Sequence, residues 1–271
     1  MVLYVCIIQK RRIAMDKKLY IQTYSVRDRM DTYEQQKETY KKLASYGYAG
    51  IQLAGDGFGW DNYKKACDEA GLKIIGGHIK YDYFFDEAKI AEISKALGTN
   101  ILGIGGFPAV FAGEKFTEEN FLESVKALRK ICENCKKNGV RFSYHHHSCE
   151  FAKIKGEFLF DIIRRELDPQ ASSFVLDTYW VVHAGIPLYE LMKSLEGRID
   201  ILHLKDKKID QGFMDGHITE LGAGTLDFKE IIKIADSIGV KYLCYEQDNG
   251  FSNNDSLDSA KASAEYFYSI V

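Results

Sequence analysis

Short apolar runs alternate with longer amphipathic stretches from Lys18 to the end of the chain. The short runs are about four to eight residues long, which is typical of buried strands. The longer stretches repeat apolar residues every three or four positions, which predicts helices. Eight strands are predicted: Leu19–Tyr24, Ala49–Leu53, Lys73–His78, Asn100–Ile104, Val140–His147, Phe174–Asp177, Ile199–Lys205 and Tyr242–Glu246.

The helical pattern lies between these strands. Several predicted helices are followed directly by glycine, as at Gly47, Gly71 and Gly98, and Gly239 follows another after one residue. Glycine supplies the left-handed backbone conformation that ends a helix and turns the chain back toward a strand. The clearest helical segments are Tyr33–Tyr46, Trp60–Ala70, Asp86–Leu97, Phe121–Asn138, Phe228–Ser237 and Leu257–Ile270.

This alternation predicts an α/β fold, a single-domain (β/α)8 TIM barrel formed by residues 16–271. Eight units of about 32 residues suit a barrel of about 250 residues. A doubly wound open sheet is the alternative. Its G-x-G-x-x-G turn is not found between a strand and a helix, because the run Gly103-Ile104-Gly105-Gly106 has a different spacing.

The first residues differ from the rest, since the apolar stretch Met1–Ile8 precedes the basic residues Lys10, Arg11 and Arg12. This stretch is too short to span a bilayer. A secretory signal would place its charges before the apolar region. We therefore expect residues 1–15 to form a poorly ordered extension outside the barrel, and we expect no membrane association.

Composition narrows the classes of partner. Asp and Glu number 39 against 36 Lys and Arg, which gives a net charge of −3, and no run of five basic residues occurs. Nucleic acid is therefore not expected as a ligand. The six cysteines are scattered, which favours a reducing, cytoplasmic location. Cys132 and Cys135 form a C-x-x-C inside a predicted helix, where we interpret them as packing residues rather than a redox or zinc pair.

In a TIM barrel the chemistry is carried by the C-terminal ends of the strands. Residues two apart in a strand point to the same side, so His203 shares its face with Lys205, and Glu246 shares its face with Cys244. Metal-type side chains gather at the ends of the last four predicted strands: His145, His146, His147, Glu150, Asp177, His203, Lys205, Glu246 and Asp248.

Asp177, His203 and Glu246 are thus expected to converge at the barrel mouth, with a fourth ligand from the fifth strand. Three oxygens and one nitrogen suit Mn²⁺ first, with Mg²⁺, Co²⁺ or Zn²⁺ as alternatives. Each residue also has an ordinary use, because Asp177 could cap a helix and His203 could be a core histidine. Their occurrence at three consecutive strand ends favours the metal site. Within the histidine triplet, His146 is expected to pack outside the barrel.

Six segments between Leu19 and the C-terminus carry a resemblance to a known family: Tyr24–Asp28, Tyr144–Phe151, Leu176–Trp180, His203–Asp206, Gly222–Phe228 and Tyr245–Asp248. In these segments the chain resembles the sugar phosphate isomerase/epimerase family, the xylose isomerase-like TIM barrels. Of the six, we interpret Gly222–Phe228 as a loop leading into a helix capped by Asp227 rather than as a phosphate site.

The resemblance implies one divalent metal, held by a carboxylate on strand five, an aspartate on six, a histidine on seven and a glutamate on eight. Asp177, His203 and Glu246 match these positions. Many relatives carry glutamate at the end of strand five, where this chain has the histidine triplet. We take Glu150 as the fourth ligand, with His145 as the alternative.

The activity implied is isomerisation or epimerisation of a sugar or polyol, by proton transfer next to a carbonyl through an enediolate. Glu246 on one face, and Glu150 or His147 on the other, are the expected acid–base residues. The residues expected to contact the substrate are His78, His145, Trp180 and Lys205.

Three other functions share features with this sequence. The histidine triplet also resembles inosose dehydratase, so a metal-dependent dehydratase acting on a keto-polyol is the alternative. An endonuclease of the endonuclease IV type would need several zinc ions and more ligands, and the acidic balance argues against it. A sugar-binding protein without catalysis is disfavoured because the expected ligand positions are filled. A homo-oligomer is compatible with the sequence.

Overall fold

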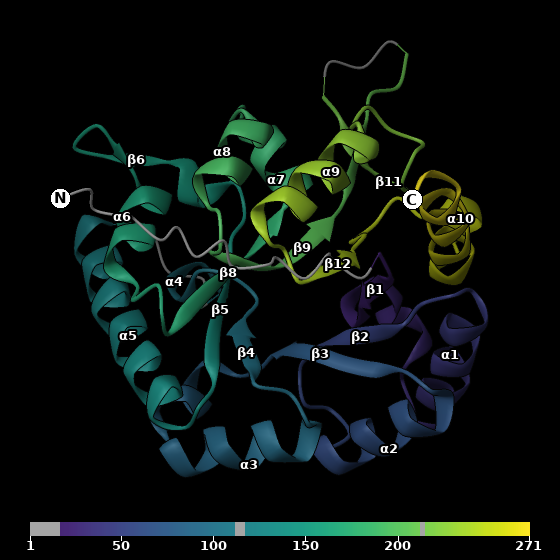
Figure 1. Ribbon diagram of the computed structural model, residues 1–271, viewed down its shortest axis with the longest axis horizontal. Coiled ribbons are helices and arrows are strands. Elements are labelled where there is room, and N and C mark those ends of the chain that lie inside the picture. The colour runs from purple at the N-terminus through teal and green to yellow at the C-terminus, as the bar shows by residue number, and fades with distance from the viewer. Residues whose placement is uncertain (1–16, 112–116, 212–214) are drawn as a thin grey trace, which may run out of the picture.

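The computed structural model describes residues 17–111, 117–211 and 215–271. Eight parallel strands close into a barrel in the order β1-β12-β9-β8-β5-β4-β3-β2, and helices surround it (Figure 1). The predicted TIM barrel is confirmed, whereas the expected extension at residues 1–15 lies outside the described residues. The barrel strands are β1 Leu19–Gln22, β2 Gly50–Ala54, β3 Lys73–His78, β4 Ile101–Ile104, β5 Arg141–His145, β8 Ser172–Asp177, β9 Ile199–Leu204 and β12 Tyr242–Tyr245.

The helices fall between the strands, as the sequence pattern predicts. The α-helices of the described residues are α1 Tyr33–Ser45, α2 Trp60–Ala70, α3 Glu87–Leu97, α4 Pro108–Phe111, α5 Glu118–Lys137, α6 Leu159–Glu166, α7 Thr178–His183, α8 Leu188–Ser194, α9 Phe228–Ile238 and α10 Ser256–Ile270. The 3-10 helices are η1 Thr23–Arg29, η2 Tyr81–Phe85, η3 Cys149–Phe151 and η4 Ser252–Asn254.

Glycine ends several helices in the way expected. Gly71 and Gly239 follow α2 and α9 with φ values of +72° and +81°, in the left-handed region. This conformation lets their N–H groups bond the last carbonyls of the helix and turns the chain toward the next strand. Cys132 and Cys135 are buried, unpaired thiols on α5, which confirms their interpretation as packing residues.

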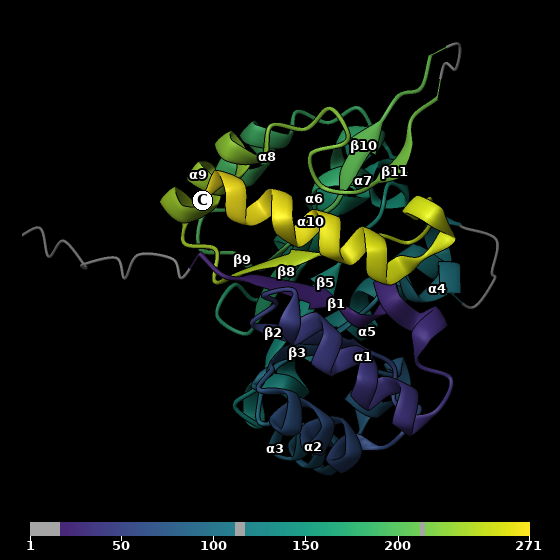
Figure 2. The ribbon, with the colours of Figure 1, turned by 90° about the vertical axis from the view of Figure 1, so that its right-hand side faces the viewer.

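Two small antiparallel hairpins were not predicted. One pairs β6 (Lys153–Ile154) with β7 (Glu157–Phe158), and the other pairs β10 (Asp206–Lys208) with β11 (His217–Thr219). The second follows directly from β9 and lies beside α7, while α10 runs across the outside of the barrel near β1 (Figure 2). None of the described helices is both long and apolar enough to cross a membrane.

The barrel interior changes from apolar to polar along the strands. Its apolar layer includes Val175 of β8, Ile201 of β9 and Cys244 of β12, and it is separate from the larger core between the strands and the helices. Two residues further along the same strands stand Asp177, His203 and, just beyond β12, Glu246. Because side chains two apart share a face, the apolar layer forms the floor beneath a polar site at the C-terminal rim.

Candidate metal centre and active site

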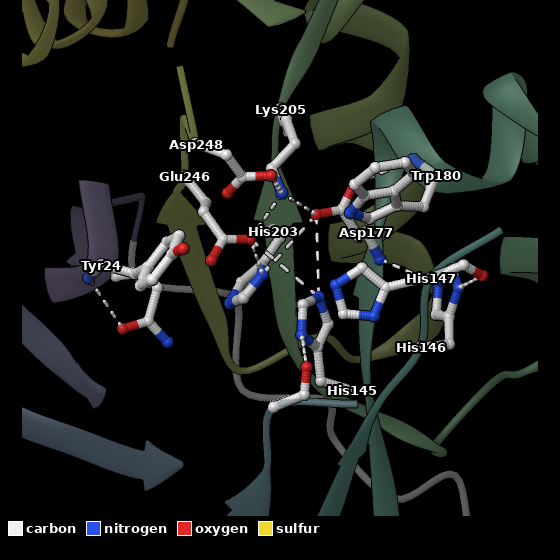
Figure 3. A network of polar contacts seen from close by, with 12 residues as sticks. Tyr24, His145, His146, His147, Asp177, Trp180, His203, Lys205, Glu246 and Asp248 are labelled. Carbon is white, nitrogen blue, oxygen red and sulfur yellow. Dashed lines mark hydrogen bonds and ion pairs between the residues drawn. The ribbon is translucent and has the colours of Figure 1, made fainter. Parts of the chain in front are cut away.

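Four buried side chains converge at the C-terminal end of the barrel: His145, Asp177, His203 and Glu246 (Figure 3). One candidate ligand atom from each lies within 4.8 Å of the others. They come from the ends of β5, β8, β9 and β12, four strands that are neighbours in the closed sheet. The structure therefore brings together the three residues expected to converge, and it adds His145.

The four facing atoms are close but make no hydrogen bonds among the described residues, although the two carboxylate oxygens also form ion pairs with Lys205. His203 Nδ1 lies 2.8 Å from Glu246 Oε2 and 3.7 Å from Asp177 Oδ2, and His145 Nε2 lies 3.8 Å from that Asp177 oxygen. Buried polar atoms in this state are unfavourable unless a charged group lies between them. Two imidazole nitrogens and two carboxylate oxygens are a donor set that suits a divalent transition metal.

Both histidines of the cluster are oriented from outside it. His145 Nδ1 lies 3.1 Å from the carbonyl oxygen of Gly105, and His203 Nε2 lies 2.6 Å from Gln52 Oε1. Each outer nitrogen therefore carries the hydrogen, and the inner nitrogen presents its lone pair to the centre. Burial opposes a charge on His203, but the Glu246 and Asp177 carboxylates outweigh it and raise the pKa of this imidazole.

Asp177 has both of the uses weighed from sequence. Its Oδ1 accepts the backbone N–H of Trp180 at 3.0 Å and caps α7, while its Oδ2 faces the cluster. Burial alone would raise the pKa of Asp177, but the Lys205 ammonium and the nearby histidines hold it well below its usual value. One carboxylate thus both begins a helix and offers a ligand atom.

His146 packs outside the barrel, as expected. Its ring contacts Phe151 and Phe160, with centroid distances of 5.5 and 5.4 Å. Its Nδ1 lies 3.0 Å from the His147 carbonyl, and its Nε2 accepts the backbone N–H of Asp177 at 3.1 Å. His146 therefore ties the end of β5 to the end of β8.

The structure does not place Glu150 in the cluster, which corrects the expectation that it supplies the fourth ligand and an acid–base group. Its carboxylate accepts hydrogen bonds from the Tyr144 hydroxyl at 2.8 Å, the His147 backbone N–H at 2.9 Å and the Cys149 thiol at 3.0 Å. The chain leaves β5 after His145 and turns through η3, so the carboxylate folds back on its own strand. His145, the alternative, takes the position in the cluster.

Lys205 supplies positive charge next to the cluster and is 1% exposed. Its Nζ lies 2.8 Å from Glu246 Oε2, 3.0 Å from Asp177 Oδ2 and 3.1 Å from Asp248 Oδ2. Burial opposes the ammonium, but these three carboxylates raise the pKa of Lys205 above its usual value. The same Nζ lies 5.4 Å from the ring centre of Trp180.

A cavity of about 280 Å³ opens beside the four side chains. His78 and His147 line it, and burial lowers the pKa of both, to about 3 for His147, so both imidazoles are neutral at neutral pH. Trp180 lies against His147, with ring centroids 5.2 Å apart. Of the described residues that line the cavity, none is a lysine or an arginine: Gln22, Tyr24, Ala54, Gly55, His78, Gly105, His145, His147, Glu246 and Asp248.

The glycine-rich loop that follows β11 is held from within. Asp206 Oδ2 accepts the backbone N–H groups of Gly222 and Gly224, each at 3.0 Å. Asp227 Oδ1 accepts the N–H of Glu230 at 3.1 Å and caps α9. The interpretation of this segment as a loop and helix cap is confirmed, because these N–H groups are occupied by a carboxylate of the chain itself.

Sequence reasoning gave no role to Gln52, and it counted Asp248 among the side chains at strand ends without assigning it one. Gln52 is an uncharged amide inside β2, and its contacts with His78 and His203 depend on how three separate strands align. Asp248 lies just beyond β12, where the two-residue period no longer applies. The only available signal was that both lie at or near the C-terminal ends of strands.

A parallel barrel with imidazoles and carboxylates converging at its C-terminal rim has the layout of TIM-barrel enzymes. The chain belongs to the xylose isomerase-like TIM barrel family, whose model matches residues 40–270. This match confirms the family expected from the sequence motifs.

The individual proteins that the chain resembles share less than a third of its residues in the matched regions. The chain is 28% identical over 210 residues to an inosose dehydratase of Mesomycoplasma hyopneumoniae (strain 7448), in a match that covers 71% of this chain and 67% of that protein. A sugar phosphate isomerase/epimerase from Parabacteroides distasonis ATCC 8503 superimposes with a TM-score of 0.75 at 22% identity, covering 98% of this chain and 97% of that one. The IOLI protein with a zinc atom gives 0.69 at 14% identity, with coverages of 94% and 98%. At these identities the structural likeness shows the fold.

Proposed function

We propose that the protein is a metal-dependent lyase that removes water from a keto-polyol of the inosose type. The observation that carries this proposal is the convergence of His145, Asp177, His203 and Glu246 beside a cavity lined by neutral imidazoles. The relatives named inosose dehydratase support the substrate class. The absence of cationic side chains from the described cavity lining supports an unphosphorylated substrate.

The four facing atoms fit a divalent cation. When bound there, a cation would polarise the substrate carbonyl and stabilise the negative charge that develops on its oxygen. Because an imidazole stands where a carboxylate was expected, the donor set moves from one that favours Mn²⁺ or Mg²⁺ toward one that favours Zn²⁺ or Co²⁺. The zinc of the structurally similar IOLI protein is consistent with this preference.

Glu246 removes the proton next to the carbonyl. Burial would raise the pKa of Glu246, but Lys205 and His203 hold it well below its usual value, so the carboxylate is ionised at neutral pH. Of the cluster's two carboxylates, Asp177 has one oxygen committed to the cap of α7, whereas Glu246 lines the cavity.

The same carboxylic acid then returns this proton to the leaving hydroxyl. The C–H electron pair forms the new C=C bond as the C–O bond breaks, so the products are one water molecule and the unsaturated ketone. Glu150 is not available as a second carboxylate in the cavity, and Asp248, which does line it, is paired with Lys205, which favours loss of the proton and the hydroxyl from one face. His147 and His78 line the cavity together with Glu246 and would hold the remaining hydroxyls, whereas Lys205 and Trp180 lie behind this lining.

A sugar isomerase or epimerase is the second candidate. The observation that favours it is the presence of two neutral imidazoles, His78 and His147, in the same cavity as Glu246. Epimerisation at one carbon needs a second proton carrier, and these imidazoles supply one.

Proton NMR in D₂O separates the two candidates. The zinc-loaded enzyme is incubated with a panel of inososes and keto-sugars, with E246Q as the inactive control and E150Q as the matched active one. A dehydratase gives an unsaturated ketone that has lost water, and an isomerase gives a sugar of unchanged composition that has gained deuterium. Neither product from any member of the panel would contradict both candidates.

A further inference from the structure

A chain of hydrogen bonds connects the candidate metal centre to the cavity through the buried amide of Gln52. Gln52 lies on β2 and is 1% exposed. Its Oε1 lies 2.6 Å from His203 Nε2, and its Nε2 lies 3.1 Å from His78 Nε2. The amide thus has one imidazole on each side, one from the cluster and one from the cavity lining.

The surroundings of His203 leave this amide only one orientation. With a cation bound through Nδ1, the nitrogen that faces Glu246 Oε2 at 2.8 Å, the remaining ring nitrogen Nε2 carries the hydrogen. Gln52 Oε1, 2.6 Å away, is placed to accept that hydrogen. The amide nitrogen then points toward His78.

The orientation of Gln52 also determines the tautomer of His78. The Gln52 NH₂ group can only donate, so His78 Nε2 must accept, and the hydrogen of the neutral ring lies on Nδ1. Gln22 Nε2, which is also a donor because Gln22 Oε1 faces the Tyr24 N–H, lies 3.4 Å from His78 Nδ1. This longer contact cannot be a hydrogen bond when Nδ1 carries the hydrogen, so we take the 3.1 Å contact with Gln52 to set the tautomer. Since His78 lines the cavity, its Nδ1–H is offered to an oxygen there.

We propose that Gln52 is a positioning residue that fixes the tautomers of His203 and His78 together. His78 consequently presents an N–H donor to a carbonyl or hydroxyl oxygen of the substrate. The coupling of the two tautomers is independent of any activity, whereas the donor role of His78 rests on the proposed function.

The tautomers can be read directly by long-range ¹H–¹⁵N NMR of the zinc-loaded protein labelled with [¹⁵N]histidine. The wild-type protein is expected to carry the His78 hydrogen on Nδ1 and the His203 hydrogen on Nε2. A His78 hydrogen found on Nε2 in the wild type would overturn the proposal.

We call the two contacts of Gln52, with His203 and with His78, the Gln52 relay. Two substitutions test these contacts separately. Q52E keeps an acceptor for His203 but turns a second oxygen toward His78, so the His78 hydrogen should move to Nε2 while zinc affinity does not fall. Q52L removes both contacts, and zinc affinity should drop roughly 10–100-fold, as for other outer-shell partners. The control is Q36L, because Gln36 is a buried glutamine of α1 that belongs neither to the cluster nor to the cavity lining.

If Gln52 has only a structural role, Q52E should lower the free energy of unfolding and leave the His78 hydrogen on Nδ1. That outcome would contradict the proposal. The role of His78 as a hydrogen-bond donor to the substrate is tested separately, by the KM for the ketone. Q52E should raise KM for the ketone while zinc affinity is retained, and an unchanged KM with a reversed tautomer would remove His78 as a donor. If the tautomers respond as expected but no ketone is dehydrated, the proposed function fails and the relay stands.

Discussion

His145 Nε2 lies 3.8 Å from Asp177 Oδ2, so the end of β5 brings an imidazole to the cluster where the family resemblance implied a carboxylate. The nearby Glu150 carboxylate is instead occupied by three donors close to its own strand. This difference changes both the expected ligand set and the expected metal.

His145 and Glu150 can be separated by matched substitutions. H145A should weaken zinc binding by more than the roughly 10–100-fold that outer-shell partners contribute, because it removes a direct ligand. E150Q should change zinc affinity much less, since its effect reaches the cluster only through the backbone near His147. Calorimetric titration of both variants measures the difference, and a larger loss in E150Q would restore Glu150 as the ligand.

The identity of the metal should follow the donor at the end of β5. H145E replaces an imidazole nitrogen with a carboxylate oxygen, so the ratio of zinc to manganese affinity should fall. Competition between the two ions, followed by metal analysis of the protein, gives the ratio for the wild type and the variant. An unchanged ratio would mean that His145 does not contact the ion.

The two uses of Asp177 can be tested apart. D177N keeps an oxygen able to cap α7, so the metal-free variant should unfold within about 1 kcal/mol of the wild type, while zinc affinity and activity collapse. D227A removes the cap of α9 and should lower the free energy of unfolding by about 1 kcal/mol without changing zinc affinity. Urea unfolding and zinc titration of both variants check that D177N loses zinc affinity and D227A loses stability. A D177N variant that binds zinc as the wild type does would exclude this ligand.

Stability at low pH should depend on Glu220. Its carboxylate accepts bonds from the Ser259 hydroxyl at 2.5 Å and the Ser252 backbone N–H at 2.9 Å. Burial alone would raise the pKa of Glu220, but these bonds lower it to about 2. The stabilisation is therefore present above the ordinary pKa near 4.5 and is lost as the pH falls from there toward about 2.

E220Q accordingly should reduce the free energy of unfolding at neutral pH by about 1–3 kcal/mol. It should also flatten the loss of stability in the acid range. E265Q, at an exposed position on α10, serves as the control. Urea unfolding across this pH range measures the effect, and an E220Q curve parallel to the wild-type curve would contradict it.

The site residues that lie within strands could be predicted from the sequence, because the two-residue period of a strand shows which side chains share a face. Asp177 and His203 lie at the ends of β8 and β9, where strand ends and shared faces predicted convergence, and the structure adds the apolar layer beneath them. Periodicity gave no guidance at Glu150, because the chain has left β5 and turned through η3. The three residues of β10 are too few for a periodic signal, so that hairpin was missed.

The relay through Gln52 could not be predicted for a different reason. It joins β2, β3 and β9, and which residues of those strands lie level depends on the stagger of the closed barrel rather than on spacing along the chain. A neutral amide also carries no charge pattern that would mark it as part of a site.

The central claim is that His145, Asp177, His203 and Glu246 together hold one divalent cation. An anomalous difference map, recorded at the zinc edge from crystals grown with zinc, tests this claim most directly. We predict a single strong peak at the C-terminal end of the barrel, within bonding distance of one atom from each of the four side chains. A barrel mouth without a peak, or a peak bonded to Glu150 instead of His145, would contradict the account.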